Sequence, residues 1–313
     1  MDTIGKLRKV FIAFVAAGLV ACGGGGNSGP APAVYSGITD PAKVDNGNSK
    51  PFNETASIGS GSGSGIGGVF SAAQNNSSDR NNLKAFAKSF RNITKSLDVK
   101  NTNPGSQDGL AAAINDSIQG DCGGSMSFNI NYDENTHVFS GNISFNNLND
   151  CDSTINGSVS FSGTLVPSSE SMSGFKMSFN AVSFTDSDAS MTMTGDITLT
   201  SLSINQDRMV MNMDFRNNNT NVTYRVQNLS ILETTNGSVE ITVVESGRVY
   251  HPEYGYVTVS TPTPIETNVS DQNPSSGVLL MVGDASSATV TYLDSNNYTI
   301  QIDHGNDGGR TGF

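Results

Sequence analysis

The chain has 313 residues, with 17 basic against 29 acidic side chains and a formal charge of −12 at pH 7. After the first 21 residues no basic residues stand side by side, and no basic patch stands out. This argues against nucleic acid and anionic headgroups as partners of the body. The acidic balance favours solubility and identifies no ligand.

The first 21 residues have the organisation of a secretory signal peptide. Lys6, Arg8 and Lys9 form a charged start, and the apolar run Val10–Val20 follows it. That run is too short to span a bilayer, which needs about 20 apolar residues. The four residues from Leu19 to Cys22 resemble the lipobox of bacterial lipoproteins. The resemblance implies cleavage before Cys22 and acyl chains, such as palmitate, at that cysteine; the alternative is an ordinary signal peptide with a cysteine at the cleavage site.

Acylation of Cys22 would hold the mature protein on a membrane, because two or more acyl chains give stable anchoring. Gly23 follows the cysteine, at the position where an inner-membrane retention signal would have Asp. Similarity to the proteobacterial sorting rule therefore favours the outer membrane, without specifying its periplasmic or its surface face. Removal of residues 1–21 leaves 14 basic and 28 acidic residues, a formal charge of −14.

The two remaining cysteines, Cys122 and Cys151, are predicted to form a disulfide, because pairing is the default in an oxidising compartment. The residues between them predict a hairpin in which Tyr132 faces His137 across the turn. A bridge closing this loop of about 29 residues would contribute roughly 3–4 kcal/mol. The alternative is a redox-active or metal-binding pair, but the sequence has neither CxxC spacing nor a nearby histidine cluster.

Residues 22–78 are rich in glycine, serine and asparagine, and include the alternating run Gly59–Gly65. Such a composition buries too little apolar surface to offset its ordering entropy, so we expect a flexible tether. The body then covers residues 79–313. Apolar residues at helical spacing predict a helix over residues 80–97 and a weaker one over 107–118. The first is also basic, which leaves open that it lies on a membrane, although packing on the sheet is the preferred interpretation.

From residue 125 onward apolar and polar residues alternate with period two, which predicts antiparallel strands. Several glycines share a face with the large apolar residues, and this indicates close packing or sharp sheet curvature. We expect a mainly β protein, with an antiparallel meander forming a strongly curved sheet, barrel or half-barrel and one or two N-terminal helices packed on it. The clearest alternating runs are Ile155 to Leu165, Met191 to Leu199, Met209 to Phe215 and Val239 to Val243.

Three stretches of the body carry short motifs: Cys122 to Val159 with its hairpin, Tyr254 to Thr261, and the closing Asp303 to Gly309. Together they resemble a pattern in uncharacterised proteobacterial lipoproteins. The resemblance implies a β-rich envelope protein and brings no activity with it.

The sequence predicts no catalytic residues and no cofactor. His137, His251 and His304 lie far apart, and no hydrolase, metalloprotease, phosphate-binding or dinucleotide-binding motif occurs. Asp303 and Asp307 are weak candidates for a calcium site, because oxygen ligands cluster there beside turn glycines. A solvated turn is the preferred interpretation, since the chain ends before the later ligand positions of a calcium loop.

These observations favour a lipid-anchored, non-catalytic structural or interaction module, with another envelope protein as the candidate partner. The alternative is a carrier of a hydrophobic ligand or lipid within the curved sheet. Methionine side chains would give such a carrier an adaptable lining, although they would serve equally as core. They are Met191, Met193, Met209, Met211 and Met213.

Overall fold

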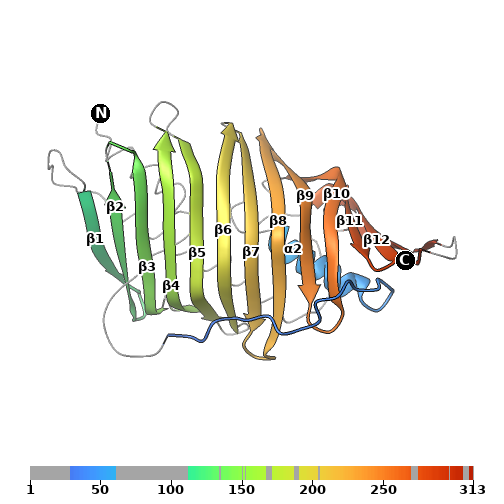
Figure 1. The fold of residues 1–313 in the computed structure, drawn as a ribbon, viewed down its shortest axis with the longest axis horizontal. Helices are drawn as coiled ribbons and strands as arrows, with labels where there is room; N and C mark the ends of the chain where they lie inside the picture. The colour runs from blue at the N-terminus through green and yellow to red at the C-terminus, as the bar shows by residue number, and fades with distance from the viewer. Residues whose placement is uncertain are drawn as a thin grey trace.

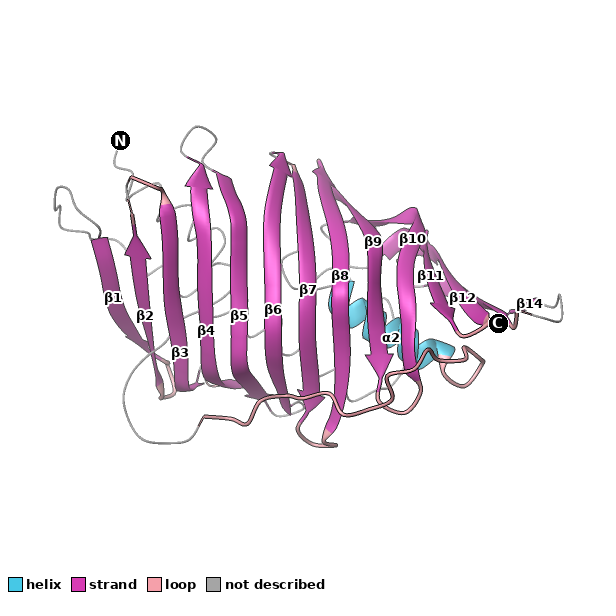
Figure 2. Ribbon diagram, viewed as in Figure 1, coloured by secondary structure: helices cyan, strands magenta, loops and turns pink. Residues whose placement is uncertain are grey.

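The computed structural model describes residues 29–60, 112–133, 135–149, 151, 153–166, 171–186, 190–203, 205–268, 274–295, 297–305 and 310–312. In this part of the chain one helix accompanies a sheet of fourteen strands (Figures 1 and 2). The elements are α2 Ser49–Ser60, β1 Ala112–Gln119, β2 Ser125–Tyr132, β3 Val138–Asn149, β4 Ser153–Val166, β5 Ser171–Asp186, β6 Ser190–Ser203, β7 Gln206–Asn217, β8 Val222–Asn236, β9 Val239–His251, β10 Gly255–Asn268, β11 Pro274–Gly283, β12 Ser286–Asp294, β13 Asn297–Asp303 and β14 Arg310–Gly312.

Each strand pairs antiparallel with the next strand in sequence, from β1 to β14. The prediction of a mainly β antiparallel meander is therefore confirmed. The sheet is open, because β1 and β14 have only one neighbour each in the strand order. The closed barrel, one of the forms expected, is not formed. β1 and β14 form the two opposite edges of the sheet and lie at opposite sides of the molecule (Figure 2).

The period-two pattern divides the sheet into an apolar and a polar face. In β7, Met209, Met211 and Met213 are buried, while Val210 and Asn212 between them are partly exposed. The same alternation runs through the neighbouring strands, so that one face carries the hydrophobic core. The methionines are thus core residues.

Glycines on the apolar face make room for aromatic rings of the adjacent strand, which is one of the two roles that the sequence indicated. Gly141 pairs with Phe161 across β3 and β4, and Phe139 pairs with Gly163 in the same ladder. A Cβ atom at Gly163 would lie 2.7 Å from the Cζ atom of Phe139, and one at Gly141 would overlap the Phe161 ring. Each ring therefore covers the glycine opposite it.

Helix α2 packs on the apolar face, across β8 and β9, and lies behind these strands in Figure 1. It begins after a turn in which the Asp45 carboxylate accepts hydrogen bonds from the backbone N–H groups of Gly47 and Asn48. Phe52 is fully buried and Ala56 nearly so. None of the described helices is long and apolar enough to cross a bilayer.

Residues 31–48, named the strap here, run along one end of the sheet and lead into α2 (Figure 1). The strap first crosses the polar face, where the Ala33 N–H donates to Thr194 Oγ1 at 2.9 Å. It then passes the β9–β10 turn and forms a parallel bridge between Pro41 and Tyr256. Finally the Val44 N–H donates to Ser286 Oγ at 2.7 Å. We call this end of the sheet the strap end and the opposite one the far end.

The strap and α2 correct the prediction of a tether over residues 22–78. Residues 29–60 fold against the sheet, because a few large side chains in this glycine-rich segment find buried positions. Tyr35 and Val44 on the strap and Phe52 on α2 are all buried. The predicted helix over 107–118 is also wrong, since residues 112–119 form β1. The predicted helix over 80–97 lies outside the described residues.

Candidate functional site

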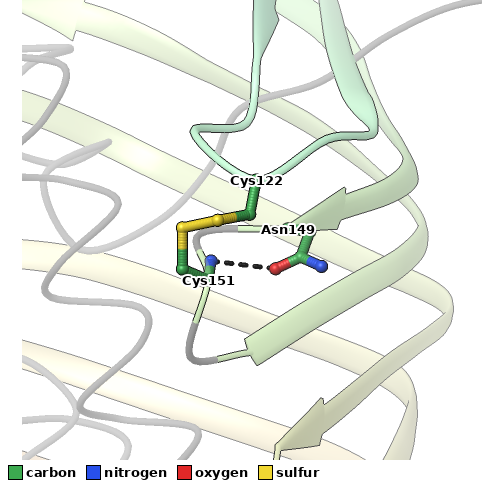
Figure 3. The surroundings of a disulfide bond; sticks show 3 residues. All are labelled: Cys122, Asn149 and Cys151. Carbon is green, nitrogen blue, oxygen red and sulfur yellow. Dashed lines mark hydrogen bonds between the residues drawn. A yellow bond between two sulfur atoms is a disulfide. The ribbon is translucent and has the colours of Figure 1, made fainter.

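The disulfide between Cys122 and Cys151 is present and joins two turns at the strap end (Figure 3). Cys122 lies between β1 and β2, Cys151 lies between β3 and β4, and their Cα atoms are 4.9 Å apart. Asn149 organises the corner: its backbone oxygen accepts from the Cys122 N–H, and its side-chain oxygen accepts from the Cys151 N–H at 2.8 Å. The bridge thus fixes the first four strands to one another at this end.

The hairpin register differs from the predicted one by two residues. Tyr132 pairs with Phe139 and not with His137. The turn is larger because the Asp133 carboxylate accepts hydrogen bonds from the N–H groups of Asn135 and Thr136, and these bonds lower the pKa of Asp133. His137 takes the left-handed conformation at φ 56°. The cysteines still meet, because the β3–β4 turn brings the chain back.

An aromatic and ionic cluster attaches the strap to the sheet, and we call its residues Tyr35, Asp214, Arg225, Tyr250 and His251 the strap cluster. The Arg225 guanidinium donates two hydrogen bonds to the Asp214 carboxylate, at 2.8 and 2.9 Å. Asp214 also accepts from the Tyr35 N–H at 2.9 Å. The Arg225 Cζ atom lies 5.0 Å from the centre of the Tyr35 ring, a cation–π arrangement. One carboxylate therefore holds both a strand and the strap.

The phenol of Tyr35 serves a structural role. Its hydroxyl lies 2.7 Å from the carbonyl oxygen of Ile38 and 3.1 Å from that of His251, with both oxygens placed to accept. Burial raises the pKa of Tyr35 to about 12. The phenol therefore stays neutral at physiological pH, and its hydroxyl is directed at backbone acceptors within the fold. This arrangement gives no poised acid or base.

His251 lies in an aromatic group at the β9–β10 turn. Its ring stacks on Tyr254 with centroids 4.4 Å apart, and it meets Phe52 and Tyr224 edge to face. His137 belongs to the β2–β3 turn at the far end, and His304 follows β13. The structure therefore does not bring the three histidines together.

The weak calcium candidate gains no support from the described part. Asp303 accepts a hydrogen bond from the Gly305 N–H at 2.9 Å, which is a local turn contact. Asp307 lies outside the described residues. Among those that are described, no group of three or more His, Cys, Asp or Glu residues is arranged to hold a metal ion.

One carboxylic acid on the apolar face has an unpaired oxygen. Glu233 lies near the end of β8, paired across the ladders with Asp207 on β7 and Thr242 on β9. Its Oε1 atom is buried and has no hydrogen-bond partner. Burial raises the pKa of Glu233 well above its usual value, and the nearby charges of Glu240 and Asp207 add to this. Ionisation of the Glu233 carboxyl in the folded protein therefore lowers the free energy of unfolding.

Comparisons of the chain with protein-family models, with curated proteins and with solved structures each find no match. Of the site residues expected from the sequence, Cys22 lies outside the described residues, and Cys122 and Cys151 meet as predicted. The strap cluster was not predicted. Its sequence signal is slight, because Tyr35 is an isolated aromatic residue in a segment whose average composition indicates disorder.

Proposed function

We propose that this chain is a lipid-anchored protein of the outer membrane, whose body is a non-catalytic structural or interaction module. The observation that carries the proposal is the sequence Leu19 to Cys22 directly after an apolar run with a basic start. An oxidising compartment beyond the inner membrane agrees with the bridge between Cys122 and Cys151.

The organisation of the body supports a module without chemistry of its own. The charged and phenolic groups of the strap cluster bond to one another, to backbone atoms and, for Tyr250, to the Gln227 side chain. The broad polar face of β3 to β5 carries mainly serine, threonine and asparagine. A broad, weakly charged polar face of this kind offers contact area to another envelope protein.

The alternative proposal, a carrier of a hydrophobic ligand, rested on a methionine lining. Met209, Met211 and Met213 are at most 3% exposed within the core. This burial among core residues favours the module over the carrier. Native mass spectrometry of the purified protein tests this preference: a retained lipid of defined mass would favour the carrier.

Metabolic labelling with a palmitate analogue tests the anchor. We expect label on the wild-type chain and none on Cys22→Ser, which should also lose its partitioning into detergent. The matched control is the double variant Cys122→Ser/Cys151→Ser, which should keep the label because Cys22 is unchanged. Label that persists on Cys22→Ser, or a wild-type chain that is unlabelled and released, would refute the lipid anchor.

A further inference from the structure

The strap limits how far the body can stand from the lipid. The Arg216 guanidinium donates hydrogen bonds to the carbonyl oxygens of Ala31 and Pro32, at 3.0 and 3.2 Å. From Cys22 to Ala31 the numbering advances by nine residues. A fully extended chain spans at most about 3.5 Å per residue, so nine residues reach at most about 30 Å. The predicted 57-residue tether would have allowed roughly 200 Å by the same rule.

The point of attachment lies at one end of the sheet. Arg216 is the second-last residue of β7, next to the turn that leads into β8. The far end is separated from it by the length of a strand. For the 15 residues of β8 that length is about 50 Å. The lipid therefore reaches the strap end much more easily than the far end.

Exposed large apolar side chains occur at both ends of the sheet, with Val138, Leu202 and Leu293 at the far end, and at the strap end a tyrosine accompanies the aliphatic ones. Val34 is 64% exposed and Ile38 45%, both on the strap, and Tyr254 is 36% exposed on the β9–β10 turn. The Ile38 N–H donates to the Pro252 carbonyl at 3.1 Å, which places Ile38 beside that turn. A tyrosine with neighbouring aliphatic groups suits the headgroup region. There its ring can contact the apolar part of the lipids while its hydroxyl contacts water.

We propose that the strap end of the sheet faces the lipid surface and that the far end points away from it. The inference rests on the proposed acylation of Cys22. Charges at this end are mixed, with Lys43 near Asp40 and Asp45 on the strap itself. Such a surface gains little from electrostatic attraction to a bilayer. Its contact with the membrane depends on the lipid and on Val34, Ile38 and Tyr254.

Energy transfer to the membrane tests the orientation on the full lipidated protein. Single cysteines replace exposed turn residues at the two ends of β8, as Asn219→Cys at the strap end and Ser238→Cys at the far end. Each labelled protein is incorporated into phosphatidylethanolamine–phosphatidylglycerol vesicles that contain a headgroup-linked energy acceptor. We expect the donor at position 219 to lose most of its intensity and the donor at position 238 to lose little.

Two controls separate the effect of the short segment between Cys22 and Ala31 from the effect of the exposed apolar side chains. A Gly/Ser insertion of about 40 residues after Gly26 adds an r.m.s. span of roughly 35 Å and should remove most of the contrast. Ile38→Ser should reduce transfer from position 219. Leu293→Ser should not, because it changes an exposed aliphatic residue at the far end, which is 58% exposed against 45% for Ile38.

The outcomes distinguish this inference from the anchor itself. Equal transfer from both positions, or higher transfer from 238, in protein that floats with the vesicles overturns the orientation and leaves the anchor intact. Protein that does not float with the vesicles overturns the proposed acylation. If the difference in transfer between positions 219 and 238 persists after the long insertion, the exposed apolar side chains of the strap end orient the body, and the short segment from Cys22 to Ala31 does not.

Discussion

Two parts of the strap end are held in different ways. At β1 to β4 the turns are exposed and a covalent bond between Cys122 and Cys151 joins them. From β6 to β12 the strap and α2 hold the strands with hydrogen bonds and with the buried side chains of Tyr35, Val44 and Phe52. A cross-link suits a corner with little apolar surface to bury. A returning chain segment stabilises the other part because it brings apolar side chains from far away in sequence.

The largest effect on stability should come from truncation of Phe52, the buried aromatic residue of α2. Its ring is fully buried and lies 6.2 Å from the ring of His251 and 6.1 Å from that of Tyr254, between centroids. Phe52→Ala should lower the free energy of unfolding by about 3–5 kcal/mol, through lost burial and the cavity left behind. Chemical denaturation measures this loss. Hydrogen exchange should accelerate in β8 to β10 and stay unchanged in β2 to β4.

The control is Val34→Ala, on the strap that leads into α2. Because Val34 is mostly exposed, its truncation should change the stability by no more than about 0.5 kcal/mol. If Phe52→Ala had an equally small effect, α2 would not be part of the folded body. Faster exchange spread evenly over all strands would show that the two regions unfold as one unit.

The sequence predicted the strands well because each strand carries its own alternating pattern. It failed at β1, where Ile114 and Ile118 are four residues apart, a spacing that fits a helix and a strand alike. In the structure they pair with Ile130 and Met126 of β2, so the neighbouring strand decides. Local pattern alone does not contain that information.

The strap was missed for a related reason. Its contacts are long-range, such as the hydrogen bond from Tyr35 to Asp214, which lie 179 positions apart. Composition averaged over residues 22–78 hid the few side chains that are buried. The disulfide was predictable because assigning Cys22 to the lipid leaves only two cysteines. Its hairpin register was not, because hydrogen bonds to Asp133 set the size of the turn.

A smaller effect on stability is expected from removal of the disulfide between Cys122 and Cys151. The double variant Cys122→Ser/Cys151→Ser should lose about 2–4 kcal/mol, as expected for opening a loop of this length. Hydrogen exchange should accelerate from β1 to β4 and stay unchanged in α2 and β8 to β10, the reverse of the Phe52→Ala pattern. The free-thiol content of the exported wild type should be zero. Two titratable thiols, or unchanged exchange in β1 to β4, would contradict this role of the bridge.

The smallest effect concerns Glu233 and depends on pH. Its pKa in the folded protein is raised above the usual value near 4.5, so the folded state binds its proton more tightly than the unfolded state does. The tighter proton binding contributes its full stabilisation below the pKa that Glu233 has in the unfolded state. This contribution is lost as the pH rises through the pKa that Glu233 has in the folded state. Glu233→Gln, which cannot ionise, should therefore gain about 1 kcal/mol at pH 7 and nothing at pH 4.

Glu245, on the neighbouring strand β9, provides the matched control because its pKa is shifted in the opposite direction. Its side chain accepts hydrogen bonds from Arg208 and Ser230, and these bonds lower its pKa. Its stabilisation is present above the usual pKa and is lost as the pH falls through the lowered one. Glu245→Gln should cost about 0.5 kcal/mol at pH 7, since the pair is exposed, and nothing in strong acid. Denaturation curves from strong acid to pH 8 measure both variants. Parallel curves for Glu233→Gln and the wild type would mean that the Glu233 carboxyl is already satisfied when ionised. Opposite slopes for the two variants would show that the buried acid weakens the fold at neutral pH, whereas the exposed ion pair strengthens it.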